Sequence, residues 1–205
     1  MTRTMLMVAA LLLCVEPAGA APDLLARMAA VNPSLRSYTA TLHAEIHLLT
    51  FPFLSTDIVG TLYRKEPDRE KLVVTSGLPF VAQNFGKLYP NIVSPSRWEQ
   101  MFVVTQAGDD GGITRLRLVP RKRGNVDHID VSVDDATALV TSLRWNYRNG
   151  GYALMKQRFA PIQGEELAIA EQGHIQEPGY VADITATLDG YHVNVPLSES
   201  IFEQP

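Results

Sequence analysis

Histidines and carboxylates are the side chains in this sequence that could bind a metal ion or act as general bases. His43 and His47 flank Glu45 at alternate positions, which share one face when the chain is extended. Two imidazoles and a carboxylate at this spacing could contribute to a metal site, but the sequence places no third imidazole beside them. The pattern favours the polar outer face of a strand over a metal site.

The other histidines give the same interpretation. His128 lies between Asp127 and Asp130 in an alternating stretch that is typical of a solvated strand face, and His174 and His192 have no neighbour of a telling type. The sequence contains no His-Glu-x-x-His, no Gly-x-Ser-x-Gly and no phosphate-binding glycine loop. We therefore expect no metal, no cofactor and no enzymatic activity.

The composition of the chain limits the kinds of molecule that it could bind. The chain of 205 residues is 46% hydrophobic and 20% charged, with a formal net charge of −4. These values indicate a globular protein, and the acidic balance argues against nucleic-acid binding. One basic run, Arg121-Lys122-Arg123, precedes a Gly-Asn turn. It is interpreted as a solvated hairpin tip, with an acidic partner or a lipid headgroup as the alternative.

The first twenty residues have the pattern of a secretory signal peptide. Arg3 supplies a positive charge, residues 5–15 form an apolar run, and Ala18-Gly19-Ala20 fits a small-x-small cleavage site. We expect residues 1–20 to be removed and residues 21–205 to form one domain in the periplasm.

The single cysteine, Cys14, lies within this predicted signal. Leu13 occupies the position where a lipidated cysteine would be preceded by a small residue, so lipidation is disfavoured. A chain cleaved after Ala20 would have no thiol for a disulfide, a cysteine-ligated zinc ion or a nucleophile.

Alternation of apolar and polar residues predicts a mainly β fold of the α+β class, with about ten to eleven strands in succession. Short turns join most of these strands, so we expect a single antiparallel sheet, which must curl at this size. Two to three helices, near residues 23–37, 79–89 and 197–202, would cover its concave face. The predicted strands are 38–50, 58–65, 69–75, 98–105, 113–119, 126–133, 139–148, 152–159, 167–175, 181–188 and 191–195.

The hairpin in residues 57–75 carries a sequence pattern that resembles a known family. Its segment Gly60-Thr-Leu-Tyr-Arg-Lys-Glu-Pro67 resembles the Gly-x-Leu-x-x-Lys-x-Pro hairpin of LolA/LolB-type lipoprotein carriers. The segment Tyr191-His-Val-Asn194, followed by residues 196–202, resembles the closing Tyr-x-x-Asn and Leu-x-Asp-x-x-Phe of the same superfamily. The order of the predicted elements is also similar.

This resemblance implies an incomplete barrel capped by helices, whose apolar interior holds acyl chains. It also implies a pocket arginine that gates the lid, and Arg64 occupies the equivalent hairpin region. The function implied is a periplasmic carrier, monomeric, that binds an acylated or otherwise apolar cargo, with inner- or outer-membrane transport proteins as further partners. The alternative is a regulatory module that senses lipoprotein or lipid with the same fold, and a hydrolase ranks third.

The alternation of residues along the strands, together with the predicted helix 79–89, predicts which residues line the interior. Alternation alone does not decide on which face Leu62 and Leu72 lie. Some of the set must be solid core, because protein interiors are close-packed. The predicted lipid-binding residues are Leu42, Ile46, Leu48, Leu62, Leu72, Val74, Phe80, Phe85, Leu88, Phe102, Leu116, Leu118 and Trp145.

Overall fold

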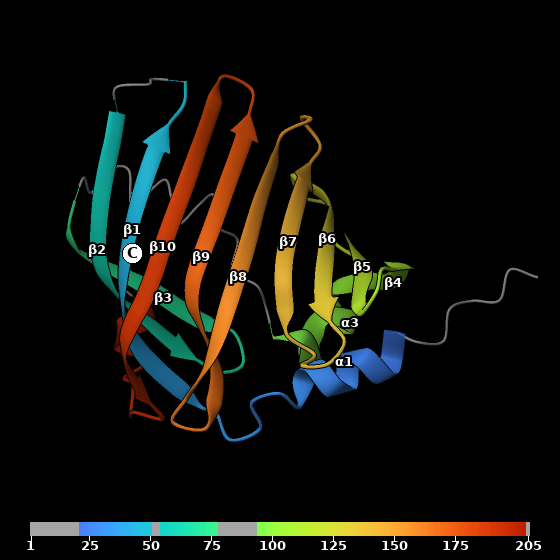
Figure 1. Ribbon diagram of the computed structural model, residues 1–205, viewed down its shortest axis with the longest axis horizontal. Helices are drawn as coiled ribbons and strands as arrows, with labels where there is room; N and C mark the ends of the chain where they lie inside the picture. Colours follow the sequence, from blue (N-terminus) through green and yellow to red (C-terminus); the bar gives the residue numbers. More distant parts are fainter. Residues whose placement is uncertain (1–20, 51–53, 78–93, 204–205) are drawn as a thin grey trace, which may run out of the picture.

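A computed structural model shows a ten-stranded antiparallel sheet with short helical segments at its ends (Figure 1). The structure describes residues 21–50, 54–77 and 94–203. The predicted signal peptide, residues 1–20, and the predicted helix 79–89 lie outside the described residues. No helix in the described part of the chain is long and apolar enough to span a bilayer.

The strands follow the order β3-β2-β1-β10-β9-β8-β7-β6-β5-β4 across the sheet. Strands β4 to β10 form a continuous meander, and β10 pairs with β1 to join that meander to the N-terminal strands. The two edge strands, β3 and β4, are not paired with each other, so the curled sheet is an incomplete barrel, as predicted. The strands are β1 (Ser37–Leu48), β2 (Leu54–Lys65), β3 (Arg69–Ser76), β4 (Phe102–Asp109), β5 (Ile113–Pro120), β6 (Val126–Asp134), β7 (Val140–Tyr147), β8 (Tyr152–Ile162), β9 (Glu165–Glu177) and β10 (Tyr180–Val193).

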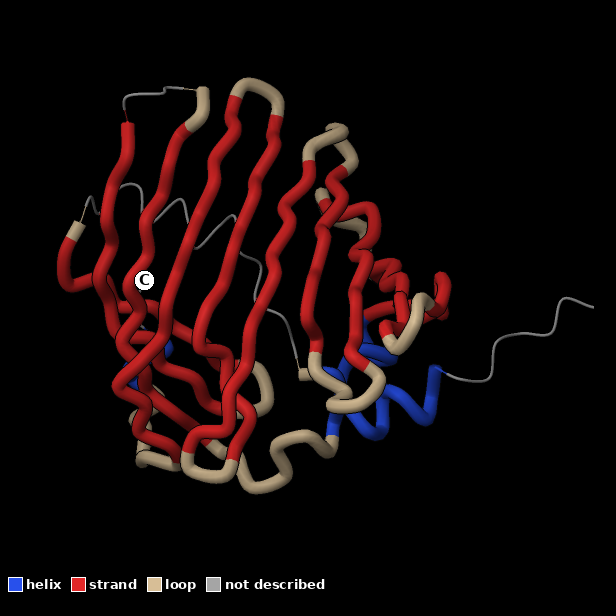
Figure 2. The backbone as a smooth tube through the Cα atoms, in the orientation of Figure 1, coloured by secondary structure: helices blue, strands red, loops and turns tan. Residues whose placement is uncertain are grey.

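The helical segments are α1 (Ala21–Ala29), the 3-10 turn η1 (Pro95–Arg97), α3 (Trp98–Met101) and α4 (Ser200–Glu203). Strands dominate the fold, and α1 and α3 lie near its β4 end (Figure 2). The apolar side of α1 is buried in the same core as the sheet, through Leu24, Leu25 and Met28. Helix α4 is attached to the other end, where Glu199 before it receives ion pairs from Lys65 and Arg69.

The strand registers place one set of side chains on the concave face. In β1 the buried residues Ala40, Leu42, Ala44 and Ile46 alternate with more exposed ones, as period-two patterning requires. Their partners across the ladders continue this face through the other strands, with buried side chains in β2 and β5 to β10 and partly buried ones in β3 and β4. The core is therefore a single apolar layer on the inner side of the curved sheet.

A glycine lets the β2–β3 hairpin bend close to this face. A Cβ atom on Gly60 would lie 2.8 Å from the Val73 carbonyl oxygen and 2.9 Å from Leu72 Cδ1, so a larger residue would force the two strands apart. The register also shifts between Val59 and Gly60. The close approach of β3 thus explains why a glycine occupies this position of the hairpin pattern.

Two predicted elements differ from the structure. The strand predicted for 98–105 begins with the helical turn α3, and the ladder starts only at Phe102. The two strands predicted for 181–188 and 191–195 are one strand, β10. Gly190 has a φ of 58°, and the register shift between Thr39 and Thr41 accommodates this irregularity within the strand.

Candidate ligand cavity

A cavity of about 630 Å³ lies on the concave side of the sheet. Its walls come from the β1–β3 end, from β7 to β10, from α1 with the loop that follows it, and from Ser94 to Trp98. Elements far apart in the sequence therefore enclose one space. This volume is within the range of about 300–1,000 Å³ that is usual for small-molecule sites.

The cavity wall is mainly apolar. Large side chains reach it from the sheet, from α1 and from the segment that begins α3, so an alkyl chain could be buried against them. The large apolar wall residues, apart from proline, are Met28, Val31, Leu35, Leu42, Leu62, Leu72, Trp98, Val140, Trp145, Met155, Phe159, Leu167 and Leu188.

The ten predicted lipid-binding residues that the structure describes all lie on the concave face, and they include Leu62 and Leu72. Only some of them line the cavity: Leu42, Leu62, Leu72 and Trp145. The other six, Ile46, Leu48, Val74, Phe102, Leu116 and Leu118, belong to the same face but are not among the wall residues. Phe80, Phe85 and Leu88 lie outside the described residues.

Arg64 lines the cavity, on the same face as Leu62. Its Nε atom lies 3.2 Å from Glu66 Oε1, and one terminal nitrogen lies 3.1 Å from Glu70 Oε2. Burial opposes its charge, but the attraction of Glu70 and Glu66 outweighs burial and raises the pKa of Arg64. Two ion pairs therefore hold the guanidinium at the cavity wall.

Several polar residues that the sequence did not predict as site residues reach the cavity, among them Tyr38, Gln157 and Glu171. Gln157 Nε2 donates a hydrogen bond to Glu171 Oε1 at 2.8 Å. Burial raises the pKa of Glu171; the Gln157 hydrogen bond lowers it, and the negative charge of Glu70 raises it further. The pKa of Tyr38 is also raised, first by burial and then by Glu70, so its hydroxyl keeps its proton.

The alternation of residues along β9 and β1 indicates that Glu171 and Tyr38 lie on the apolar face. Glu171 has the parity of Leu167 and Ile175 in β9, and both of those apolar side chains are buried. Tyr38 has the parity of Leu42 in β1. A carboxylate on the apolar face of a strand is the feature that could have identified this part of the site.

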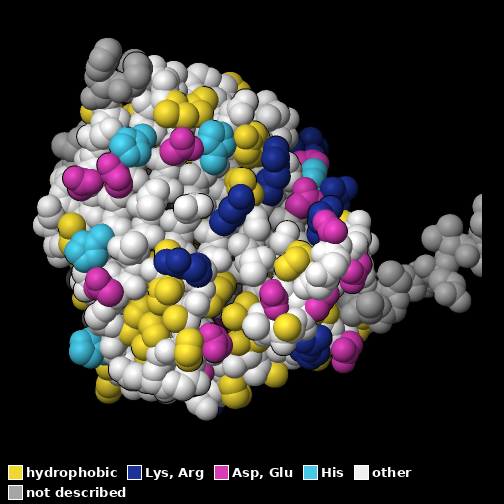
Figure 3. Space-filling view, viewed as in Figure 1, with side chains coloured by type: hydrophobic (Ala, Val, Ile, Leu, Met, Phe, Trp, Pro, Cys, Tyr) yellow, Lys and Arg dark blue, Asp and Glu magenta, His cyan; other side chains and the backbone are white. Residues whose placement is uncertain are grey.

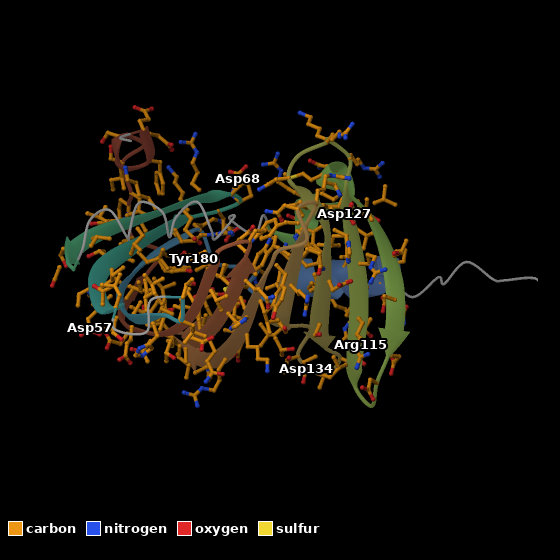
Figure 4. All side chains as sticks on the ribbon, turned by 90° about the horizontal axis from the view of Figure 1, so that it is seen from above. Asp57, Asp68, Arg115, Asp127, Asp134 and Tyr180 are labelled. Carbon is orange, nitrogen blue, oxygen red and sulfur yellow. The ribbon has the colours of Figure 1, made fainter. Side chains whose placement is uncertain are left out.

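Loop contacts lie next to the cavity wall. Asp68, at the tip of the β2–β3 hairpin (Figure 4), forms an ion pair with Arg97 of η1. Asn194, with a φ of 56°, accepts a hydrogen bond from the Arg36 backbone N–H at 2.7 Å and donates one to the Ser34 carbonyl at 3.2 Å. The asparagine of the closing sequence pattern therefore fixes the loop between α1 and β1.

The histidines lie away from the cavity wall, on the outer face. Figure 3 shows this face, where histidines are scattered among acidic and basic side chains. His47 contacts Ser55 Oγ at 2.7 Å through Nδ1 and Glu45 Oε1 at 3.1 Å through Nε2. This set resembles a nucleophile, base and acid, but it lies on an exposed strand surface and its members are not among the cavity residues.

Within the part of the chain that the structure describes, no group of three or more His, Cys, Asp or Glu residues could hold a metal ion. His174 is paired with Asp183 at 2.6 Å, and His128 lies 3.0 Å from Asp127 and 3.3 Å from Asp130. These contacts lie on the solvent-accessible outer face.

The comparisons with known proteins identify the fold. No family model matches the sequence, and no curated protein matches it. A LolA superfamily protein from Nitrosomonas europaea, NE2245, matches with a TM-score of 0.64 at 9% identity, over 90% of this chain and 97% of that one. A candidate outer membrane lipoprotein-sorting protein domain from Vibrio parahaemolyticus gives 0.65 at 10% identity, over 88% and 95%.

A DUF1329 family protein from Desulfovibrio piger ATCC 29098 matches with a TM-score of 0.63 at 14% identity, over 91% of this chain and 97% of that one. At these identities the likeness concerns the fold alone. The chain thus has the half-barrel fold of LolA superfamily proteins, and the fold predicted from the hairpin and the closing pattern is confirmed.

Proposed function

We propose that the protein is a periplasmic carrier, which binds an acylated or otherwise apolar cargo in the concave-face cavity and moves it across the cell envelope. The observation that carries this proposal is the cavity itself, a space of about 630 Å³ with a mainly apolar wall in a fold of the LolA type. Partners would be the acyl chains of a lipid or lipoprotein, and membrane proteins that load and unload it.

The physical basis is the burial of apolar surface. Each square ångström of apolar surface removed from water contributes about 25 cal/mol, so a chain buried along the wall could contribute several kcal/mol. Cargo would enter and leave when the elements that close the cavity separate. Arg64 is suited to a gating role, because its ion pairs join the β2 side of the hairpin to the turn and to β3.

We propose no catalytic role for the cavity. The polar residues of the described part of its wall are Tyr, Gln, Glu, Arg, Lys, Asn and Ser, and this part of the wall contains no histidine or cysteine. A hydrolase would need a nucleophile and a base. The candidate set of His47, Ser55 and Glu45 lies on the exposed outer face, and none of the three residues lines the cavity.

The proposal includes export and processing between Ala20 and Ala21. The chain should be expressed with its own first twenty residues, purified from the periplasmic fraction and weighed by mass spectrometry. A mass that begins at Ala21 is expected, and an intact Met1 or a lipid on Cys14 would contradict the proposed processing.

Cargo is tested on the same material. Organic extraction and mass spectrometry should find a co-purifying lipid, and the delipidated protein should bind an environment-sensitive fatty-acid probe. Leu62→Glu, in the cavity wall, should abolish binding, whereas Val103→Glu, on a side chain that is 46% exposed, should leave it unchanged. A wild-type protein that binds no apolar probe would exclude the carrier function.

A transfer assay separates the carrier from the regulatory alternative. Loaded protein should deliver its lipid to acceptor vesicles or to an acceptor protein. Binding without delivery, together with capture of a regulatory partner only in the lipid-bound state, would favour the sensor instead.

A further inference from the structure

The cavity wall has an acidic position that its apolar character does not explain. Glu171 points from β9 into the concave side, with Ala186 of β10 and Gln157 of β8 as its ladder partners. Gln157 donates one hydrogen bond to one carboxylate oxygen, at 2.8 Å. Glu171 is therefore a carboxylate in a mainly apolar wall, which also carries Glu66, Glu70 and Glu166.

Arg64, a cation of the same cavity wall, already has two carboxylate partners. Arg64 is paired with both Glu66 and Glu70, at 3.2 and 3.1 Å. No cation among the described residues lies within 4.0 Å of the Glu171 carboxylate, the limit for an ion pair.

The other cations among the described wall residues, Arg36 and Lys71, also have partners. Arg36 donates hydrogen bonds to the carbonyl oxygens of Pro33 and Leu35, and Lys71 has a partner as well. Glu171 thus lacks a positive charge that the protein itself could supply from these residues. Burial raises the pKa of Glu171, which shows that the folded protein disfavours the ionised form in the absence of a ligand.

A buried carboxylate is stabilised when a cation pairs with it. An anionic head would instead meet the negative charges of Glu171 and Glu70, and it would have to displace a glutamate to reach Arg64. We propose that the cargo of this cavity is an amphiphile whose head carries a protonated amine, and that the amine binds the Glu171 carboxylate while the alkyl chain lies along the apolar wall. This inference rests on the proposed carrier function and names its substrate class.

Tyr38 supports the same orientation. No hydrogen bond of its hydroxyl is found among the described residues, and Tyr38 lines the cavity, where its pKa is raised first by burial and also by the nearby negative charges of Glu70 and Glu171. A head that bears an amine and a neighbouring polar group could therefore use Glu171 and the Tyr38 hydroxyl together.

The experiment compares three amphiphiles with the same chain: dodecylamine, dodecanol and dodecanoate. Each is titrated against an environment-sensitive apolar probe bound to the delipidated protein at pH 8. Dodecylamine should displace the probe at a concentration about tenfold or more below that of dodecanol, because a hydrogen bond between charged groups contributes more binding free energy than a neutral one. Dodecanoate should be the weakest, because its carboxylate is repelled by Glu171.

Variants assign the preference to one residue. Glu171→Gln keeps the size and the polar contact with Gln157 but removes the charge, so the amine and the alcohol should become equal within about twofold, with unchanged affinity for the apolar probe. Glu45→Gln, the matched change on the exposed outer face of β1, should keep the wild-type preference.

The outcomes separate this inference from the proposed function. If wild type binds the apolar probe but all three amphiphiles displace it equally, or if Glu171→Gln keeps the amine preference, the inference is wrong and the carrier function stands. If wild type binds no apolar probe, the carrier function fails and the amine site fails with it. The comparison of amphiphiles on wild type decides the question even if a variant does not fold.

Discussion

Asp68 and Arg97 form an ion pair that joins the β2–β3 hairpin at one end of the sheet to η1 next to β4 at the other. The neighbours of both residues, Pro67 and Ser96, line the cavity. The pair therefore joins two parts of the cavity wall, the β2–β3 hairpin and η1, which lie at opposite edges of the sheet. It is half-exposed, with 37% of each side chain accessible, so it can break without unfolding the core.

We expect Arg97→Ala to accelerate cargo release without a large loss of stability. An ion pair at this exposure contributes about 0–1 kcal/mol to the free energy of unfolding, so the melting temperature should change little. The release rate of a bound apolar probe, measured by stopped-flow dilution, should rise several-fold, because the two walls are no longer joined.

Arg115→Ala is the control for the loss of a surface arginine. It breaks a comparable pair with Asp110, at 2.7 Å, in the β4–β5 hairpin, and neither residue lines the cavity. Equal release rates for Arg97→Ala and wild type, or equal acceleration in both variants, would show that the Asp68–Arg97 pair does not restrain the cavity.

The sequence predicted the sheet and its inner face well because both follow from period-two alternation. The hairpin pattern around Gly60 and Pro67 added the incomplete barrel through family resemblance, and the structure confirms that fold. Leu62 and Leu72 could not be assigned from parity alone, since β2 is apolar on both faces, and the ladder register resolves their face.

Two local errors have physical causes. The strand predicted from Trp98 is wrong in its first four residues, because Pro95 opens the 3-10 turn η1 and the helix α3 continues it to Met101 before the ladder starts at Phe102. The Asp189-Gly190 pair reads as a turn, yet the left-handed Gly190 is accommodated by a register shift inside β10.

The cavity itself could not be predicted from parity. Leu42 and Ile46 lie on the same face of β1, but only Leu42 lines the cavity. That difference depends on where α1, the β2–β3 hairpin and η1 cover the sheet, which are contacts between segments distant in sequence. Parity selects a face, whereas the distribution of empty space over that face depends on packing.

The turn between β6 and β7 gives a prediction on stability. Asp134 Oδ1 accepts hydrogen bonds from the Thr137 backbone N–H at 2.8 Å, the Ala136 backbone N–H at 3.0 Å and the Thr137 hydroxyl at 2.9 Å. The Thr137 backbone bond and then its hydroxyl hold the pKa of Asp134 below its ordinary value of 3.8. Asp134 is the last residue of β6 and is labelled in Figure 4.

We expect Asp134→Ala to lower the urea midpoint at neutral pH. Since the folded pKa is lowered, the stabilisation by the carboxylate is present above the ordinary pKa and is lost as pH falls through the folded pKa. The difference between variant and wild type should therefore shrink in strong acid. Asp134→Asn, which retains one acceptor oxygen, should keep more of the midpoint, and an unchanged midpoint in Asp134→Ala would refute the role of the turn.

Glu171 predicts the opposite pH dependence. Burial raises its folded pKa above the ordinary value of 4.5, so the folded state binds more protons than the unfolded state between these two values. Its contribution to stability is fully present below 4.5 and is lost as pH rises through the folded pKa. Glu70 faces the same group and adds to the shift, while Gln157 opposes it.

We expect Glu171→Gln to melt above wild type near pH 8 and at the same temperature near pH 4, without ligand present. Differential scanning calorimetry at the two pH values measures this directly. Glu45→Gln should show no such crossover, because Glu45 lies on the exposed outer face. A Glu171→Gln melting temperature that stays below wild type at both values would indicate that the carboxylate stabilises the apo protein.

The last prediction separates cavity wall from packed core with the same substitution at two leucines. Leu72 lines the cavity and is partly accessible, whereas Leu118 is 1% exposed and is not among the wall residues. A new carboxylate at position 72 can be hydrated from the cavity, but one at position 118 is buried without a partner. Leu72→Glu should abolish probe binding and reduce the free energy of unfolding by about 1–2 kcal/mol, and Leu118→Glu should reduce it by more than about 4 kcal/mol. Chemical denaturation and probe titration on both variants measure the two effects, and equal stability losses would show that Leu72 is core rather than cavity wall.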